Sequence, residues 1–262
     1  MNCDGKLKKI QENHLNKVLL ITGGSRGIGA ATALLAAGQG YAVAVNYTAN
    51  SLAADEVVRQ IRSGGGTAIT VQADVALEAD VLAMFKKVDA KLGRVTALVN
   101  NAGVVDQPSR VDTMTVERLQ RMFAINVFGS FMCAREAVKR MSTRYGGQGG
   151  SIVNVSSAAA KLGAPGQYVD YASAKGAIDT FTIGLAKEVA LEGIRVNAVR
   201  PGIIDTDIHA SGGLPNRARD VAPLVPMQRA GTAHEVAEAI VWLLGDASSY
   251  TTGSIVDVTG GR

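Results

Sequence analysis

Cysteine and histidine are scarce in this sequence, and their scarcity argues against two kinds of site. The chain has 262 residues but only two Cys, Cys3 and Cys133, and three His that lie far apart. Two Cys at this separation form neither a CxxC motif nor the framework of a disulfide-rich secreted domain. Because paired His and Cys ligands are missing as well, we expect no metal site.

Long apolar runs are also missing. No stretch of about 18 uncharged apolar residues occurs, so we expect no membrane-spanning helix. The N-terminal segment lacks the continuous apolar stretch of a secretory signal. We therefore interpret residues 1–16 as an N-terminal extension, expected to be flexible and of unassigned role, and we expect a cytoplasmic protein.

The net charge is small, at +4, and half of it lies in the first 17 residues, where four Lys stand against Asp4 and Glu12. A tail of this composition is more often a solvated extension than a nucleic-acid-binding arm, and the rest of the chain shows no basic stripe. We therefore expect no nucleic-acid partner.

Aromatic residues make up only 5% of the chain, whereas 47% is hydrophobic and 30 residues are Gly. This length and apolar content suffice for one large core and are small for two. We therefore predict one domain over residues 17–262.

Short apolar runs alternate with longer segments of helical period. Strands are predicted at residues 17–22, 41–47, 67–72, 95–100, 151–156, 194–199 and 254–258. Helices are predicted at residues 27–38, 51–63, 78–92, 115–144 (one or two helices), 171–192 and 233–245. This alternation is typical of βαβ units. It predicts an α/β fold: a Rossmann-type, doubly wound parallel sheet of about seven strands with helices on both faces.

One long segment, at about residues 203–230, lacks this periodicity and contains three Pro. Long irregular segments in compact domains are often lids or binding loops, so we expect this one to cover the substrate. Its candidate contacts are His209, Leu214, Arg217 and Arg219. For the two Arg we favour the alternative of a solvated, mobile surface.

A glycine cluster, TGGSRGIG at residues 22–29, joins the first predicted strand to the first predicted helix. Glycines let the backbone turn tightly and approach a pyrophosphate, while the helix N-terminus offers free N–H groups. The alternative is a glycine-rich turn without a ligand, because a lone motif is weak evidence. The predicted cofactor contacts here are Gly23, Ser25, Arg26, Gly27, Ile28 and Gly29.

The choice of cofactor depends on the end of the second strand. An acidic residue there would hold the ribose 2′-hydroxyl of NAD, but this strand ends in Asn46 and Tyr47. Arg26 is placed to pair with a 2′-phosphate, although it is alternatively a solvated loop charge. We favour NADP(H), with NAD(H) possible, and include Asn46 among the cofactor candidates.

Four further motifs follow in a fixed order: NNAG at residues 100–103, Asn126, YASAK at 171–175 and Pro-Gly at 201–202. Together with TGxxxGxG they resemble the short-chain dehydrogenase/reductase family over about residues 17–262. The closing stretch, from PMQR at 226–229 to TGG at 259–261, is similar to the 3-oxoacyl-carrier-protein reductase and glucose 1-dehydrogenase-like branch. The resemblance implies a homotetrameric NAD(P)(H)-dependent oxidoreductase acting on a small carbonyl or alcohol substrate.

The resemblance also implies four catalytic residues: Asn126, Ser157, Tyr171 and Lys175. The usual position of the family's catalytic Ser is occupied here by Ala158. We assign the role to Ser157, one residue further from the Tyr, with Ser156 as the second choice. A third hydroxyl, on Tyr168, has no Lys four residues later and is interpreted as a pocket wall or packing residue.

The chemistry explains these residue types. A Tyr with a pKa near ~10 is a poor acid–base at neutral pH unless a nearby ammonium favours its phenolate. Tyr171 and Lys175 share one face of a predicted helix, although such pairs also occur by chance. The resemblance implies that Lys175 bonds the nicotinamide ribose, that Ser157 bonds the substrate oxygen and that Asn126 holds a water.

Further cofactor contacts come from the resemblance alone. On the adenine side they are Asp74, Val75, Asn100, Asn101, Ala102 and Gly103, and on the nicotinamide side Tyr171, Lys175, Pro201, Gly202, Ile204 and Thr206. For Asp74 the alternative is an N-cap of the next helix.

Two rival functions remain. A sugar epimerase or dehydratase of the extended family is set aside, because it resembles TGxxGxxG and has a larger substrate domain. A catalytically idle dinucleotide sensor would be expected to lose Tyr171 or Lys175, and both are present.

For the tetramer, we expect residues 126–144 and 171–192 to pair across one interface and the C-terminal strand to pack at another. The sequence does not name the substrate.

Overall fold

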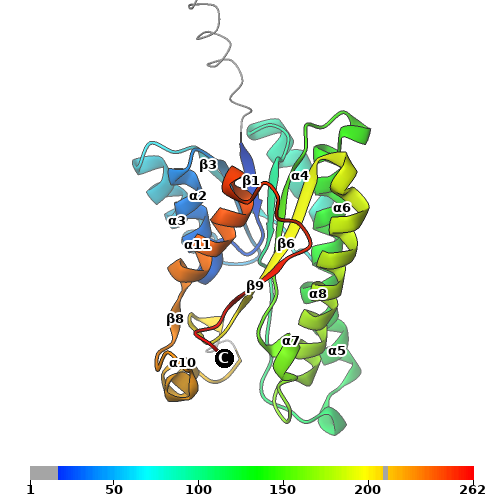
Figure 1. Ribbon diagram of the computed structural model, residues 1–262. Coiled ribbons are helices and arrows are strands. Elements are labelled where there is room, and N and C mark those ends of the chain that lie inside the picture. Colours follow the sequence, from blue (N-terminus) through cyan, green and yellow to red (C-terminus); the bar gives the residue numbers. More distant parts are fainter. Residues whose placement is uncertain (1–16, 209–211) are drawn as a thin grey trace, which may run out of the picture.

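The apolar runs pair into one seven-stranded parallel sheet in the computed structural model, which describes residues 17–208 and 212–262 (Figure 1). The strands are β1 (Val18–Ile21), β2 (Ala42–Tyr47), β3 (Ala68–Gln72), β4 (Ala97–Asn100), β5 (Gly150–Val155), β6 (Ile194–Pro201) and β9 (Ile255–Val258). Their spatial order is β3-β2-β1-β4-β5-β6-β9. This order is that of a doubly wound Rossmann sheet, and the predicted fold class is confirmed.

Helices cover both faces of the sheet, as Figure 1 shows. One layer holds α2 (Gly27–Gly38), α3 (Ser51–Ser63) and α11 (Ala233–Leu244), and the other holds α4 (Glu78–Lys91), α6 (Gly129–Met141) and α8 (Val169–Val189). Strand β1 is an uninterrupted apolar run because both of its faces are covered by helices. Leu19 and Ile21 pack into the first layer and Val18 and Leu20 into the second, and all four are fully buried.

Two predicted helices have different bounds in the structure. The segment predicted at 115–144 divides into α5 (Val116–Phe123), a π-helical turn (Ala124–Phe128) and α6. The long helix begins at Val169 rather than Tyr171, and a 3₁₀ turn (Ala190–Glu192) follows its end. The left-handed Gly193, with φ of 79°, stops the chain from continuing as a helix.

The segment predicted as an irregular loop contains short elements. Strand β7 (Ile204–Asp205) pairs in parallel with β8 (Gly231–Thr232), and α10 (Arg217–Val221) and a 3₁₀ turn (Ala222–Leu224) lie between them. Elements of two to five residues are too short to show a period in the sequence. The predicted N-terminal extension, residues 1–16, and the candidate His209 lie outside the described residues.

The topology of the sheet indicates where a ligand site is expected. The carboxyl ends of β1 and β4, which are neighbours, face the point where the strand order reverses, and ligands of such sheets bind there.

No helix in residues 17–208 and 212–262 has the length and apolarity needed to cross a membrane. Within the same residues, no group of three or more His, Cys, Asp or Glu is arranged to hold a metal ion.

Candidate active site

The glycine loop between β1 and α2 has a shape that only glycine permits. Gly23 and Gly27 adopt left-handed backbone conformations, with φ of 60° and 52°. A Cβ on Gly29 would lie 2.5 Å from the carbonyl oxygen of Gly23 and 2.6 Å from Nδ2 of Asn101. Helix α2 begins after Arg26 without a side-chain cap and without an acidic residue in its first turn. Its N-terminal N–H groups therefore remain available to an anion.

The NNAG segment braces this loop from the side. Nδ2 of Asn101 donates to the carbonyl oxygens of Thr22 and Gly23, at 2.9 Å each. The Thr22 hydroxyl accepts the backbone N–H groups of Asn101 and Ala102 at 3.0 Å. The predicted contacts Asn101 and Ala102 are thus joined to the loop. Thr22 is a bracing residue that sequence reasoning missed, although it is the Thr of the TGxxxGxG motif.

Asn46 supports the same loop from below. Its Oδ1 accepts the N–H of Gly23 at 3.1 Å, and its Nδ2 donates to the carbonyl oxygens of Val71 and Ala73. Only 1% of Asn46 is exposed, so the side chain holds β1, β2 and β3 together at the cofactor edge. The structure gives Asn46 a positioning role in this loop, and its direct contact with a cofactor stays a prediction.

Asp74 and Val75 follow β3 at this edge. The Asp74 carboxylate accepts the N–H of Ala76 at 2.9 Å, two residues on, whereas the N-cap of α4 is Leu77. The alternative interpretation of Asp74 as a helix cap is therefore wrong, and the carboxylate shapes the turn instead. Val75 is buried, and a Cβ on Gly129 would meet its side chain at 2.8 Å.

Asn126 lies inside the π-helical turn between α5 and α6. Its Oδ1 accepts the N–H of Val104 at 3.2 Å, and its Nδ2 donates to the carbonyl oxygens of Val104 and Met122 at 3.0 Å. The side chain is fully buried and joins the turn to Val104, in the irregular segment that follows NNAG. Single π turns inside α-helices occur often at functional sites. The polar atoms of the Asn126 side chain are thus engaged with protein, and its role in holding a water stays a prediction.

Tyr171 and Ser157 meet in one cavity. The Ser157 side chain hydrogen-bonds to Tyr171 and also accepts the N–H of Ala159 at 3.1 Å. The Ser156 hydroxyl instead donates to the backbone carbonyl of Lys175 at 3.2 Å and is buried. The structure therefore brings Ser157, and not the second choice Ser156, to the Tyr171 hydroxyl.

The longer spacing between Ser157 and Tyr171 is absorbed locally. A short helix, α7 (Ala159–Leu162), follows the serine, and the chain then turns through Gly163 and Ala164 in left-handed conformations. The N–H of Tyr168 closes this turn on the Ala164 carbonyl oxygen at 3.0 Å. The segment between the two residues thus folds back on itself, and Ser157 and Tyr171 line the same cavity.

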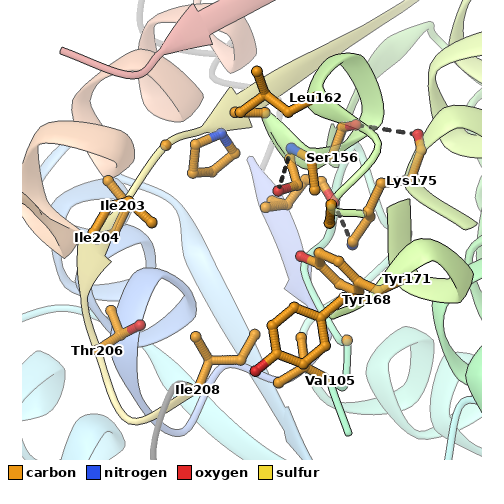
Figure 2. Close-up of a pocket in the computed structure, with 18 of the residues that line it drawn as sticks. Val105, Ser156, Leu162, Tyr168, Tyr171, Lys175, Ile203, Ile204, Thr206 and Ile208 are labelled. Atoms are coloured by element: carbon orange, nitrogen blue, oxygen red, sulfur yellow. Dashed lines mark hydrogen bonds between the residues drawn. The ribbon is translucent and has the colours of Figure 1, made fainter. Parts of the chain in front are cut away.

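Lys175 lies one helical turn after Tyr171, and its Nζ is 5.6 Å from the centre of the Tyr171 ring. Nζ donates to the carbonyl oxygen of Val155 at 2.8 Å, as Figure 2 shows. A Cβ on Gly103 would lie 3.5 Å from Nζ and 2.8 Å from Oδ1 of Asn126. The missing side chain at Gly103 therefore keeps open the space between two of the predicted catalytic residues.

The electrostatics differ from the prediction. Burial raises the pKa of Tyr171 above its ordinary value, and the hydrogen bond with Ser157 opposes this rise. Burial also lowers the pKa of Lys175 to about 8, against the attraction of Asp179. The predicted lowering of the Tyr171 pKa by Lys175 is not found for the protein alone, because burial is the larger influence and Ser157, not Lys175, is the group that opposes it.

The lowered Lys175 pKa makes stability depend on pH. Between pH 8 and 10.5 the unfolded chain keeps a proton that folded Lys175 has released, so the free energy of unfolding rises with pH in this window. We expect a rise of about 3 kcal/mol, measured by urea unfolding of the protein without cofactor. Lys175→Met should lose this slope, whereas Lys87→Met, at an exposed position, should keep it. Equal slopes in the wild type and Lys175→Met would contradict the assignment.

The cavity has a volume of about 520 Å³ and opens beside the glycine loop. Of the predicted residues, its lining includes Ile28, Asn101, Gly103, Ser157, Tyr171, Lys175, Pro201, Gly202, Ile204 and Thr206. The other predicted residues support this lining or border the loop: Gly23, Ser25, Arg26, Gly27, Gly29, Asn46, Asp74, Val75, Asn100, Ala102 and Asn126. Sequence reasoning missed the apolar wall formed by Val105, Leu162, Ile203 and Ile208.

The stretch after β6 closes the cavity opposite Tyr171. A Cβ on Gly202 would lie 2.8 Å from Cα of Thr259, so only glycine lets these two segments approach. Ile204 is buried, and a Cβ on Gly27 would meet Cγ2 of Thr206 at 3.4 Å. The Thr206 side chain is thereby placed against the glycine loop.

The predicted substrate-loop residues separate into two groups. Arg219 is exposed and pairs with Asp220, in agreement with a solvated surface. Arg217 is half-buried, lines the cavity, and holds its guanidinium 5.2 Å from the centre of the Tyr168 ring. The solvated interpretation of Arg217 is therefore wrong. Leu214 is half-buried but is not part of the lining.

Comparison with known proteins identifies the family. A family model described as Enoyl-(Acyl carrier protein) reductase matches residues 23–262. The chain is 57% identical over 245 residues to the uncharacterized oxidoreductase YgfF of Escherichia coli, covering 94% of this chain and 99% of that relative. A solved short-chain dehydrogenase/reductase from Serratia marcescens matches with a TM-score of 0.85 at 31% identity, over 94% of this chain and 97% of the other. The chain belongs to the short-chain dehydrogenase/reductase family.

A further relative indicates the branch. The chain is 40% identical over 246 residues to a 3-oxoacyl-(acyl-carrier-protein) reductase of Synechocystis, covering 94% of this chain and 96% of the relative. The protein is thus an oxidoreductase of the family, in the branch of the 3-oxoacyl-carrier-protein reductases. The resemblance seen in the sequence motifs is confirmed.

Proposed function

We propose that the protein transfers a hydride between NADP(H) and a small carbonyl or alcohol substrate, with Tyr171 as the general acid–base. One observation carries the proposal: Tyr171, Ser157 and Lys175 all line a cavity that opens beside a glycine loop in which side chains are excluded. An idle dinucleotide sensor of the same fold would not need these three side chains around one space.

The residues at the cavity fit a nicotinamide dinucleotide. Side chains are excluded at Gly29 by contacts of 2.5 and 2.6 Å, and the uncapped start of α2 presents N–H groups to the same place. Thr206 and Ile204 line the cavity on the wall opposite Tyr171. When bound, the nicotinamide supplies or accepts the hydride.

The chain's own residues handle the proton. In the reducing direction, the Tyr171 hydroxyl donates its proton to the substrate oxygen, and the Ser157 hydroxyl holds that oxygen by a hydrogen bond. The buried Lys175 ammonium stabilises the phenolate that Tyr171 becomes. The Val155 carbonyl oxygen, 2.8 Å from Nζ, fixes the ammonium in that position.

Isotope transfer tests the reaction directly. A carbonyl substrate reduced with NADPH that carries deuterium at the transferable position should yield an alcohol labelled on the carbinol carbon. Mass spectrometry of the product reads this out. Turnover that leaves the deuterium on the nucleotide, or places it elsewhere, would overturn hydride transfer to a carbonyl.

The preference for NADP(H) rests on Arg26, which is exposed at the start of α2, and on the absence of an acidic residue where β2 ends. A guanidinium that pairs with the 2′-phosphate contributes a charge-assisted hydrogen bond. We expect Arg26→Ala to raise the KM for NADPH about 10- to 100-fold and to leave the KM for NADH unchanged. Equal losses with both nucleotides would refute this role.

We propose a homotetramer that uses the outer faces of α6 and α8, which lie on the same side of the sheet (Figure 1). Phe131 and Ile183 are large apolar side chains that are 45% and 40% exposed there, and Phe131 stacks on Phe181 with ring centres 3.8 Å apart. Exposed apolar area of this kind marks an interface.

Sedimentation velocity at micromolar concentration tests the assembly. The wild type should sediment as a tetramer, and Ile183→Glu should shift it to smaller species. The matched control is Leu52→Glu, on the other helical layer, where the side chain is 82% exposed. This variant should remain tetrameric, and a stable wild-type monomer would refute the assembly.

A further inference from the structure

Arg217 stands at the cavity next to the proposed proton donor. Its guanidinium lies 5.2 Å from the ring centre of Tyr168, and Tyr168 is the N-cap of α8, three residues before Tyr171. Residues three apart at the start of a helix are neighbours on its surface. Figure 2 shows both tyrosine rings pointing into the same cavity. Arg217 therefore borders the space in front of the Tyr171 hydroxyl.

The guanidinium of Arg217 has no acidic partner among the residues that the structure describes. Other arginines nearby are neutralised: Arg118 pairs with the buried Asp170 at 2.8 Å, and Arg219 on the same short helix pairs with Asp220 at 3.1 Å. Arg217 is nevertheless half-buried against an aromatic ring. A guanidinium without an acidic partner can bind a planar anion by two parallel hydrogen bonds.

The charged side chains that line the cavity are all positive. Its described lining includes three cationic side chains, Lys175, Arg217 and Arg262, and no Asp or Glu. Lys175 is engaged with Val155 beside Tyr171, and Arg262 is exposed at the rim. The wall between the cations is apolar, formed by side chains such as Ile208 and Leu162. The cavity thus suits a molecule with a short apolar body and one anionic end.

We propose, on the basis of the proposed function, that the substrates are oxo acids and the corresponding hydroxy acids. Arg217 binds the carboxylate while Tyr171 and Ser157 bind the oxygen at the reacting carbon. Arg217, Tyr168 and Tyr171 line one cavity of about 520 Å³, so we expect the carboxylate to lie only a few carbon atoms from the carbonyl. The Tyr168 ring holds the guanidinium in the cavity by a cation–π contact, 5.2 Å from the ring centre.

Matched acids and esters test the proposal. We would measure kcat/KM for 3-oxobutanoate, 4-oxopentanoate and 5-oxohexanoate against their methyl esters, with wild type, Arg217→Gln and Arg219→Gln. For at least one acid the wild type should prefer the acid about 10-fold or more. Arg217→Gln should remove this preference through KM and leave turnover of the ester unchanged, whereas Arg219→Gln should behave as the wild type.

Three results would overturn the proposal: no preference for any acid in the wild type, an equal loss on acid and ester in Arg217→Gln, or an equal loss in Arg219→Gln. The affinity for NADPH provides a further check. It should be the same in wild type and Arg217→Gln, because Arg217 is proposed to bind the substrate and not the cofactor. If Arg217→Gln also lost affinity for NADPH, Arg217 would be a cofactor contact, and the proposal would be refuted.

A binding measurement separates this inference from the proposed function. Calorimetric titration with hexanoate and hexan-1-ol needs no turnover. Hexanoate should bind the wild type and Arg219→Gln, and at least about 10-fold more weakly Arg217→Gln, while hexan-1-ol should not distinguish them. If hexanoate binds through Arg217 but no carbonyl is reduced, the anion site stands and the proposed reaction fails. If hexanoate binding is absent or independent of Arg217, the anion site fails.

Discussion

Tyr171→Phe is expected to lower kcat about 100- to 10,000-fold while leaving the affinity for NADPH unchanged. Positioned general acid–base groups contribute rate factors of this size. The substitution removes only the hydroxyl that Ser157 bonds and keeps the ring over which Lys175 lies. Steady-state kinetics with a turned-over carbonyl and fluorescence titration with NADPH give the two quantities.

Tyr168→Phe is the matched control for this prediction. Tyr168 lines the same cavity, and its ring, rather than its hydroxyl, contacts Arg217. Phe keeps the ring, so kcat should change by less than about 10-fold. Equal kcat in Tyr171→Phe and the wild type, or a large loss in Tyr168→Phe alone, would show that the acid–base has been assigned to the wrong tyrosine.

Gly29→Ala is expected to weaken NADPH binding by at least about 10-fold. Its Cβ would lie 2.5 Å from the Gly23 carbonyl oxygen and 2.9 Å from Cα of Gly24, and both are backbone atoms that cannot rotate away. Overpacking of this kind costs about 1–3 kcal/mol, and here the displaced atoms form the surface that the pyrophosphate would approach. Fluorescence titration measures the affinity, and thermal unfolding measures the accompanying loss of stability.

Gly38→Ala, at the other end of α2, is the control. A Cβ there meets nothing within 4 Å. Because Gly in a helix costs about 0.5–1 kcal/mol relative to Ala, this variant should be equally or more stable. Its NADPH affinity should match that of the wild type. If Gly29→Ala also bound NADPH normally, the cofactor would not lie against this loop.

The layers of the fold were predictable because their signals are local. Strand β1 is buried on both faces, so the sequence has an uninterrupted apolar run there, and the glycine loop follows at once. The start of α8 depends instead on a distant contact. Asp170 in its first turn is buried only because it pairs with Arg118, far away in the chain. The local sequence pattern does not predict this ion pair.

The site was predictable in its residues but not in its energetics. The motif order located Ser157, Tyr171 and Lys175, and the structure brings them to one cavity. The direction of the Tyr171 pKa depends on how much water the surrounding chain excludes, which spacing does not encode. Arg217 was misinterpreted for a similar reason, since only the folded chain shows that its neighbour is the Tyr168 ring.

The central claim is that this cavity joins a nicotinamide dinucleotide to a carbonyl or alcohol through Tyr171. The most direct test is nucleotide turnover over a panel of carbonyls and alcohols, with NADPH/NADP and NADH/NAD in parallel, for wild type and Tyr171→Phe. We predict turnover of at least one substrate class by the wild type, faster with the NADP(H) pair, and near-complete loss in the variant. Tight NADPH binding with no turnover of any panel member, oxo acids included, would contradict the account and favour a dinucleotide sensor.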